Sequence, residues 1–184
     1  MNSKIIGWLD LETSGLLPTV DKIFEVGIIL TNWKLEEIVR KNWVVNQPEN
    51  VIETLSPYVN KMHTTNGLLD EIRESKSNER AVEMDVVYFL MDYVEKGTKF
   101  IVAGNSVSFD KRFIEEHFKV LDTFLHHRVI DMTSCLLLSE RWTPNKHKEI
   151  IESSKKCGHR AFSDIETCLQ HAKKFKEILF VEGD

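Results

Sequence analysis

The first third of the chain alternates apolar runs with polar breaks in a way that predicts three strands. Residues 5–9 are apolar and read as a buried strand. A second, very apolar strand is predicted over residues 23–31, and a third over residues 39–45. Because only short links separate the three segments, we expect them to pair as an antiparallel meander.

Helices are predicted after the third strand. Residues 52–62 and 68–75 read as short helices on either side of a His-Thr-Thr-Asn-Gly segment. Residues 81–94 predict a clearer helix, because apolar side chains recur there along one stripe.

Strands and helices then alternate. Residues 100–103 predict a strand that turns at Gly104-Asn105 into a helix over residues 107–118. A short strand at residues 129–130 is expected to lead into a helix near residues 134–142.

The C-terminal part is read as a polar stretch followed by one long helix. Residues 143–158 are predicted to form a mobile loop, and residues 161–180 the last helix. Three early strands followed by helix–strand alternation predict an α/β fold, a mixed sheet with helices on both faces. At 184 residues, without repeats or linkers, residues 1–184 are expected to be a single domain.

Charge and composition narrow the function classes. Apolar residues make up 42% of the chain, as in a soluble globular protein, and no apolar run is long enough to cross a membrane. The net charge of −5 means that the protein as a whole does not attract polyanions. A nucleic-acid ligand would therefore need local positive charge and bound metal, which favours a short ligand over a long duplex.

The cysteines and the N-terminal pattern bear on localisation. Three cysteines are an odd and sparse set, which indicates a reducing compartment. The first strand begins almost at Met1 and leaves no room for a signal or transit peptide, so we expect a cytoplasmic protein.

Two carboxylates stand at the end of the first predicted strand. Asp10 and Glu12 are two residues apart and therefore point to the same face. Two anions so close repel each other unless a cation lies between them, and unpaired carboxylates at a buried strand end are costly.

Three further residues indicate a functional site only when they are considered together with these two acids. Asp110 and Asp164 are each expected in the first turns of a helix, where an acid is common because the helix N-terminus stabilises its charge. His159, five residues before Asp164, would alone be an ordinary loop histidine.

The ordered set resembles the DEDDh 3′→5′ exonuclease superfamily, whose motifs supply Asp-x-Glu, Asp and His-x4-Asp. The resemblance implies a ribonuclease H-like mixed sheet and two-metal hydrolysis of phosphodiesters by Mg²⁺ or Mn²⁺, two ions per site. His159 is implied as the general base. The implied metal ligands, which are also catalytic, are Asp10, Glu12, Asp110 and Asp164.

Within the superfamily the sequence is most similar to the oligoribonuclease family, over most of the chain. The segments that carry the likeness begin at Leu9 (Leu-Asp-Leu-Glu-Thr-Ser-Gly-Leu), Met62 (Met-His-Thr-Thr-Asn-Gly-Leu), Arg128 (Arg-Val-Ile-Asp) and Gly158 (Gly-His-Arg-Ala-Phe-Ser-Asp-Ile).

This family resemblance implies roles for five substrate-binding residues. Leu16 would wedge against the bases, and His63 would pack on a base or sugar. Arg128, Thr133 and Ser134 would cap the 5′ phosphate of a very short RNA, which would explain a preference for dinucleotides. Family members are usually homodimers in which an aromatic residue just before the arginine reaches the partner's site.

In this chain that position is His127, whose ring can also stack.

Two other functions stay open at this point. A general DNA or RNA exonuclease acting on longer strands would share all five catalytic residues. A non-catalytic nucleotide-binding protein usually lacks one or more of the metal-binding acids, and all four are present here.

A zinc site is a third interpretation. Cys157 with His159, and Cys168 with His171, have spacings found in such sites. We discount it because Cys168 falls on the apolar stripe of the last helix, where a free cysteine usually fills the core.

Overall fold

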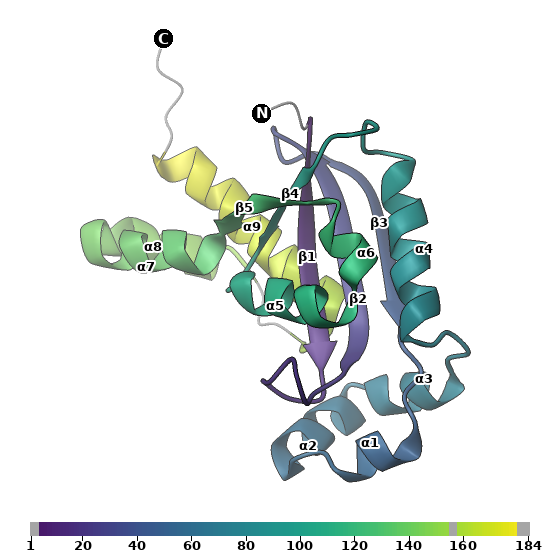
Figure 1. Ribbon diagram of the computed structural model, residues 1–184. Helices are drawn as coiled ribbons and strands as arrows, with labels where there is room; N and C mark the ends of the chain where they lie inside the picture. Colours follow the sequence, from purple (N-terminus) through teal and green to yellow (C-terminus); the bar gives the residue numbers. More distant parts are fainter. Residues whose placement is uncertain (1–3, 155–157, 180–184) are drawn as a thin grey trace.

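Five strands form one mixed sheet in the computed structural model, which describes residues 4–154 and 158–179 (Figure 1). The strands are β1 (Ile5–Thr13), β2 (Ile23–Asn32), β3 (Glu37–Val44), β4 (Phe100–Gly104) and β5 (Leu125–Asp131). Their order across the sheet is β3-β2-β1-β4-β5. The first three pair antiparallel, whereas β4 joins β1 and β5 joins β4 in parallel. The predicted ribonuclease H-like arrangement is confirmed.

The helices fall mostly where the sequence predicts them. Those of the described residues are α1 (Glu49–Glu53), α2 (Pro57–Thr65), α3 (Leu68–Glu74), α4 (Glu79–Met91), α5 (Ser108–His117), α6 (Lys119–Asp122), α7 (Met132–Trp142), α8 (Pro144–Glu152) and α9 (Ala161–Leu179). The helix predicted over residues 52–62 is in fact two, because Pro57 begins a new helix capped by the hydroxyl of Ser56. The short helix α6 was not predicted.

The predicted loop over residues 143–158 is wrong for most of its length, since α8 occupies it. Pro144 stands in the first turn of α8, where a missing N–H costs nothing. Ile150 is fully buried, and Nδ1 of His147 lies 2.9 Å from the hydroxyl of Ser139 on α7. A single buried apolar side chain anchors the helix, but one such residue does not produce a helical periodicity that could be recognised in the sequence. The predicted end of the last helix at Phe180 lies outside the described residues.

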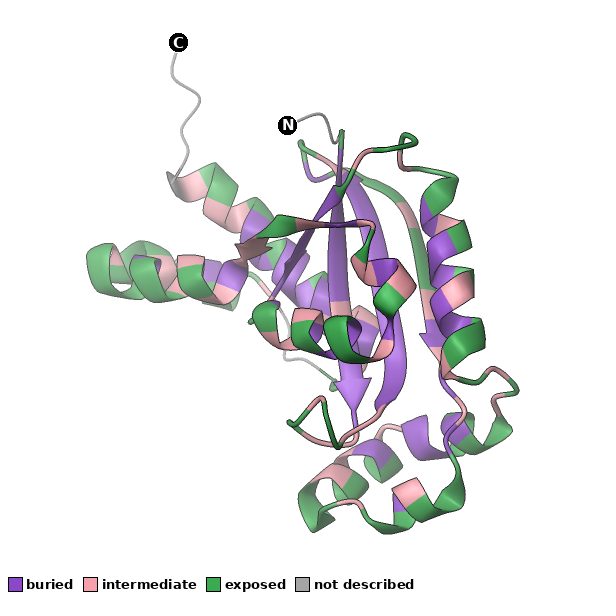
Figure 2. Cartoon of the chain, in the orientation of Figure 1, coloured by how far each residue is buried: buried purple, intermediate pink, exposed green. Residues whose placement is uncertain are grey.

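The alternation of β1 divides the core between the two faces of the sheet. Leu9 and Leu11 pack with α4, α5 and α6, whereas Ile6 and Trp8 pack with α9. The central strands are buried on both sides (Figure 2). Asp10 and Glu12 have the parity of Ile6 and Trp8 and therefore lie on the α9 face.

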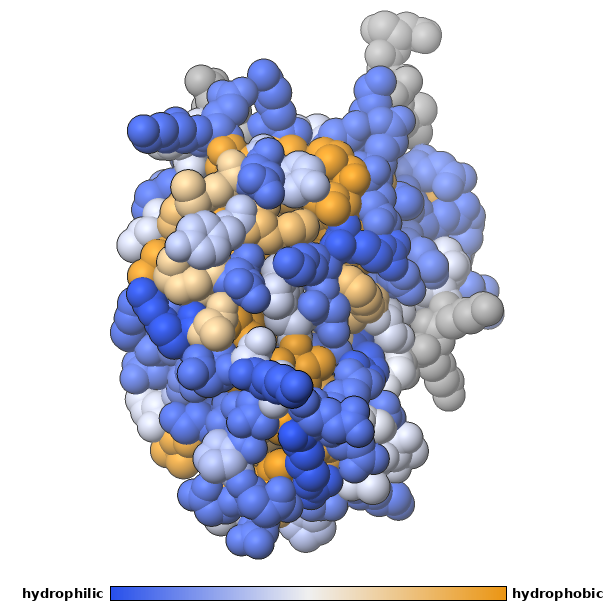
Figure 3. Space-filling model, turned by 90° about the vertical axis from the view of Figure 1, so that its right-hand side faces the viewer, coloured by the Kyte–Doolittle hydropathy of each residue, from blue (hydrophilic) through white to orange (hydrophobic). Residues whose placement is uncertain are grey.

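Helices α1, α2 and α3 lie beyond the end of β1 that carries these acids (Figure 1). They share a small apolar cluster with β2, formed by Phe24, Ile52, Leu68, Leu69 and Ile72. The face over β3 and α4 is mixed, with apolar areas among hydrophilic ones (Figure 3). Met91 is among the exposed apolar residues of α4. None of the helices within residues 4–154 and 158–179 has the length and apolar content needed to span a membrane.

Candidate active site

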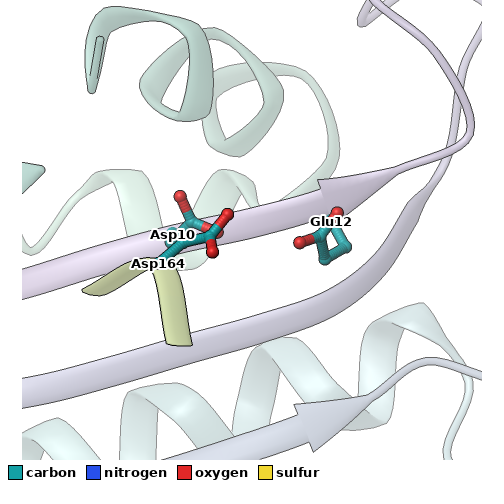
Figure 4. A group of neighbouring side chains, drawn as sticks. All are labelled: Asp10, Glu12 and Asp164. Carbon is teal, nitrogen blue, oxygen red and sulfur yellow. The ribbon is translucent and has the colours of Figure 1, made fainter. Parts of the chain in front are cut away.

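Three of the four predicted metal ligands converge at one point. Asp10 and Glu12 project from the end of β1, and Asp164 projects toward them from the first turn of α9 (Figure 4). One carboxylate oxygen from each lies within 4.8 Å of those of the other two. Carboxylate oxygens at this spacing suit a hard divalent cation, so the cluster could hold a metal ion.

A glycine brings α9 this close to the sheet. Gly27 on β2 pairs directly with Asp10 on β1. A Cβ at Gly27 would stand 2.7 Å from Cβ of Ala161 and 2.9 Å from Cδ1 of Ile165. Only glycine therefore allows the first turn of α9 to cross β2 there, and Asp164 follows Ala161 by three residues.

A buried ion pair fixes the start of α9. Glu25, which pairs with Glu12 across the strands, is almost fully buried. Arg160 donates to Glu25 from Nη2 at 2.7 Å and to Glu71 on α3 at 2.7 Å, and the Ala161 N–H donates to Glu25 at 3.0 Å. Neither Glu25 nor Arg160 was predicted as part of the site, although a lone acid in an apolar strand indicates a buried charge that needs a cation.

Asp110 reaches the same strand from the opposite side. It lies in the first turn of α5 and is buried. Its Oδ1 accepts the backbone N–H of Leu11 at 2.9 Å, between the two acids of β1. It is not part of the three-residue group within 4.8 Å, but its charge is among those that act on Asp10.

Three of the four carboxyl groups, those of Asp10, Glu12 and Asp110, have raised pKa values. Burial, with the neighbouring charges of Asp164 and Glu25, raises the pKa of Glu12 to about 8. Burial also raises the pKa of Asp110 to about 7, although the Leu11 N–H opposes the shift. Burial and the charge of Asp110 raise the pKa of Asp10 well above its usual value. Such a group of mutually repelling acids favours a cation over water.

His159, the predicted general base, is exposed and has a left-handed backbone, with φ at 51°. Nδ2 of Asn66 donates a short hydrogen bond to the carbonyl of His159. Left-handed geometry is uncommon outside glycine and concentrates at functional sites, where the surroundings hold it. Of the competing zinc residues, Cys168 is buried in the apolar cluster under α9, and Cys157 lies outside the described residues.

The two residues predicted to touch bases lie in very different environments. Leu16 is 74% exposed on the loop between β1 and β2. His63 is fully buried, with Nε2 3.4 Å from the Thr13 carbonyl and 3.9 Å from Glu12. In this structure its ring supports the end of β1, and its contact with a base or sugar stays a prediction.

The predicted phosphate cap is divided between β5, which carries Arg128, and the start of α7, which carries Thr133 and Ser134. Arg128 and Ser134 are exposed, and Thr133 is half-buried. The N–H groups of Thr133 and Ser134 already donate to Asp131, at 2.9 and 3.3 Å. Ser106, which was not predicted as a site residue, donates from its backbone N–H and its hydroxyl to Oγ1 of Thr133, at 2.9 and 3.2 Å.

A surface hollow of about 350 Å³ adjoins His159. Its lining comes from α2 and from the segment before α9: Tyr58, Lys61, Met62, Thr65, Asn66, Gly158 and His159. The exposed ring of Tyr58 gives it a flat apolar wall of the kind on which a nucleobase can stack.

Residues 8–171 match the family described as Exonuclease, and the chain therefore belongs to that family. Among its relatives, the oligoribonuclease of Haemophilus ducreyi is 37% identical over 92% of this chain and 91% of its own length. The oligoribonuclease of Idiomarina loihiensis is 32% identical over 94% of this chain and 93% of its own. These similarities place the chain in the oligoribonuclease branch of the exonuclease family.

Solved structures with the same fold include exonuclease I of E. coli. Its complex with single-stranded DNA in a zinc-bound form has a TM-score of 0.75 and 15% identity, covering 97% of this chain and 41% of that one. A complex with a 5cy-dT13 oligonucleotide has a TM-score of 0.74 and 16% identity, covering 97% and 42%. The chain thus spans about two fifths of those chains, and at this identity the likeness shows the fold alone.

Proposed function

We propose that this chain is a 3′→5′ exoribonuclease that degrades very short RNA, above all dinucleotides, to nucleoside 5′-monophosphates. The observation that carries the proposal is the convergence of Asp10, Glu12 and Asp164 from segments far apart in the sequence. Membership of the exonuclease family and the oligoribonuclease relatives support the reaction and the substrate class.

Asp10, Glu12, Asp110 and Asp164 are proposed to hold two Mg²⁺ or Mn²⁺ ions. A carboxylate has about four lone-pair sites, so Asp110 can accept the Leu11 N–H and still bind a cation. The ions, when bound, supply positive charge that polarises the phosphate and makes water a stronger nucleophile.

His159 is proposed to accept the proton of the attacking water. The new bond joins that water oxygen to phosphorus, and the bond from phosphorus to the 3′ oxygen of the preceding nucleotide breaks. The released nucleotide keeps its 5′ phosphate, and the shortened strand regains a 3′ hydroxyl. The left-handed backbone at His159, tied through Asn66, supports a side chain held in a set direction.

The phosphate cap is proposed to bind through side chains. Because Asp131 accepts the N–H groups of Thr133 and Ser134, those residues have hydroxyls left to offer. Arg128, on the preceding strand β5, would add its guanidinium. The hydroxyl of Ser106 adjoins that of Thr133 and completes the polar group. Each charge-assisted contact to a phosphate contributes about 1.5–3 kcal/mol, which is enough to favour a substrate whose 5′ phosphate lies there.

The test is kcat/KM for 5′-labelled RNAs of two, three, five and ten nucleotides with Mg²⁺ or Mn²⁺. We expect the dinucleotide to be the best substrate, and removal of its 5′ phosphate to cost one or more orders of magnitude. Arg128→Ala should erase the difference between dinucleotides with and without that phosphate. A kcat/KM that is constant or rises with RNA length would favour the general exonuclease. The absence of cleavage at every length would favour the non-catalytic binding protein.

The chain is further proposed to act as a homodimer. Helices α7 and α8 extend away from the sheet (Figure 1), and α7 leaves Leu137 and Trp142 exposed by 58% and 74%. Exposed apolar area of this kind favours burial against a second copy. A contact of His127 with the partner's site is proposed from the family resemblance. Light scattering at micromolar concentration should give twice the mass of one chain. A monomer that is fully active on dinucleotides would remove the dimer from the proposal.

The remaining proposals concern organisation and location. Residues 1–184 are proposed to form one exonuclease domain, supported by the single sheet of the described residues. A cytoplasmic location is proposed because Cys135 is a free thiol, which a reducing compartment preserves.

A further inference from the structure

The loop between β1 and β2, residues 14–22, begins directly after the strand that carries Asp10 and Glu12. Its base is closed by the N–H of Ser14, which donates to the Lys22 carbonyl at 2.9 Å. Asp21 organises its interior by accepting the N–H of Leu17 at 2.8 Å and the hydroxyl of Ser14 at 3.0 Å. These bonds give the loop a shape but do not fix its direction relative to the rest of the protein.

The outer half of this loop consists of apolar side chains in solvent. Leu16, Leu17 and Val20 are 74%, 61% and 69% exposed. Three large apolar groups on one short loop lose the hydrophobic stabilisation that burial would give them. A loop of this composition beside an active site is suited to contact an apolar or aromatic ligand surface.

His117, the last residue of α5, holds the tip of this loop. Its Nε2 lies 2.8 Å from the carbonyl oxygen of Pro18, and its Nδ1 lies 2.5 Å from Oε1 of Glu79 at the start of α4. The ring is nearly buried and stacks on Phe113, with 5.9 Å between ring centroids. Both partners are acceptors, so a ring protonated on both nitrogens donates to both and a neutral ring donates to one.

Helix α5 also contacts the chain just before this loop, in β1. Asp110, in the first turn of α5, accepts the N–H of Leu11 at 2.9 Å. The two ends of α5 therefore hold the backbone at Leu11 and at Pro18, with Leu16 between them. Of these two contacts, only the one at Pro18 lies within the loop, so a displacement of the loop tip away from α5 would have to break it.

We propose that His117 is a positioning residue, which sets the β1–β2 loop so that Leu16 meets the base of a bound dinucleotide at a fixed distance from the carboxylates. This role rests on the proposed exoribonuclease function. His117 touches no substrate, and its effect passes through Pro18 and the loop backbone.

The test compares His117→Phe, which keeps a ring on Phe113 but has no N–H, with His117→Gln, which keeps a donor for the Pro18 carbonyl. Val86→Ala, in the fully buried face of α4, serves as a control that lowers stability without touching the loop. Hydrogen exchange of the loop amides reports whether the contact between His117 and Pro18 restrains the loop. Kinetics with a 5′-phosphorylated dinucleotide give kcat and KM. Affinity for a phosphorothioate-linked dinucleotide gives Kd.

For His117→Phe we expect faster exchange at Val20 and Asp21, whose N–H groups bond to Leu17. KM and Kd should rise about three- to tenfold, the range that one lost hydrogen bond covers, with kcat within about twofold. His117→Gln should recover most of the loss, and Val86→Ala should leave KM and loop exchange unchanged.

Two results would overturn the role of His117: unchanged loop exchange in His117→Phe, or faster exchange with unchanged KM and Kd. Failure of the proposed function gives a different pattern. If the wild type binds the dinucleotide but does not cleave it, the exoribonuclease proposal falls, while weaker binding by His117→Phe still supports the loop role. If the wild type binds no dinucleotide, both proposals fall.

Discussion

Asp110 and Leu11 lie 99 positions apart in the chain, yet the carboxylate of Asp110 accepts the Leu11 N–H at 2.9 Å. Leu11 stands between Asp10 and Glu12. The bond therefore fixes α5, which carries Asp110, against the part of β1 that carries these two acids. The bond is available to a carboxylate and to an amide oxygen alike, because either can accept one N–H.

Asp110→Asn should therefore keep the fold and lose nearly all turnover. The amide can still accept the Leu11 N–H, but it removes a negative charge from the proposed metal site. The measurement is dinucleotide cleavage under saturating Mg²⁺, with the melting temperature as a check on folding. Substantial turnover in a folded variant would refute a metal-binding role for Asp110.

His159→Ala should lower kcat by about 10²- to 10⁴-fold, the usual contribution of a positioned general base. Its affinity for Mn²⁺, measured by calorimetry, should change little, because the proposed ligands are carboxylates. Loss of metal binding in this variant would instead make His159 a ligand.

Metal binding should release protons near neutral pH. Without a cation, the folded protein keeps protons on Glu12, whose pKa is about 8, and on Asp110, whose pKa is about 7, at pH values where the unfolded chain has lost them. A cation requires the ionised forms and displaces those protons. Calorimetry in buffers of different ionisation enthalpy at pH 6.5 should show release of roughly one proton or more on Mn²⁺ binding, falling toward zero at pH 9.

The same shifts set the sign of a stability effect. Because the folded-state pKa values lie above the unfolded ones, their contribution to stability is complete below about pH 4 and declines as pH rises through about 7 to 8. In EDTA, the melting temperature should fall between pH 5.5 and pH 8.5 more in the wild type than in Glu12→Gln. Equal slopes in the two proteins would contradict the raised pKa of Glu12.

Arg160→Ala should destabilise the protein by about 3–5 kcal/mol, the cost of leaving a buried carboxylate without its cation. Glu25 is almost fully buried beneath Arg160. Arg40 provides the matched control, since it also pairs with two acids, Glu37 and Glu166, but at the surface. Arg40→Ala should cost at most about 1 kcal/mol in urea unfolding. If both variants lost a similar amount of unfolding free energy, the burial of Glu25 would not be the cause of the destabilisation in Arg160→Ala.

The sequence predicted those parts of the fold that rest on strong local patterns. The strands β1 and β2 are apolar runs with short connections, and their pairing follows from chain order. Helix α8 escaped prediction because Ile150 is its one fully buried residue, and its stability comes from tertiary contacts that no periodicity records.

In the candidate site, too, residues in local sequence motifs were predicted, and residues that act through tertiary contacts were not. The acids and His159 were singled out because they stand in ordered motifs. Glu25 and Arg160, which fix the start of α9, and Ser106, which bonds to Thr133, were not, because they act through contacts with residues distant in the chain. His63 was assigned a role from its motif, but burial depends on the packing of α2 against β2, which a single sequence does not specify.

Gly27 sets how closely α9 approaches β2, and with it the spacing of the carboxylates in the proposed metal site. A methyl group there would push the first turn of α9 outward by several tenths of an ångström, since its Cβ would begin 2.7 Å from that of Ala161. Ligand distances around Ca²⁺ exceed those around Mg²⁺ by about 0.3–0.5 Å, a difference of the same size. Gly27→Ala should therefore shift the preference of the proposed metal site toward the larger ion without changing a single ligand. Ion selectivity at that site would then depend on backbone spacing as well as on ligand chemistry.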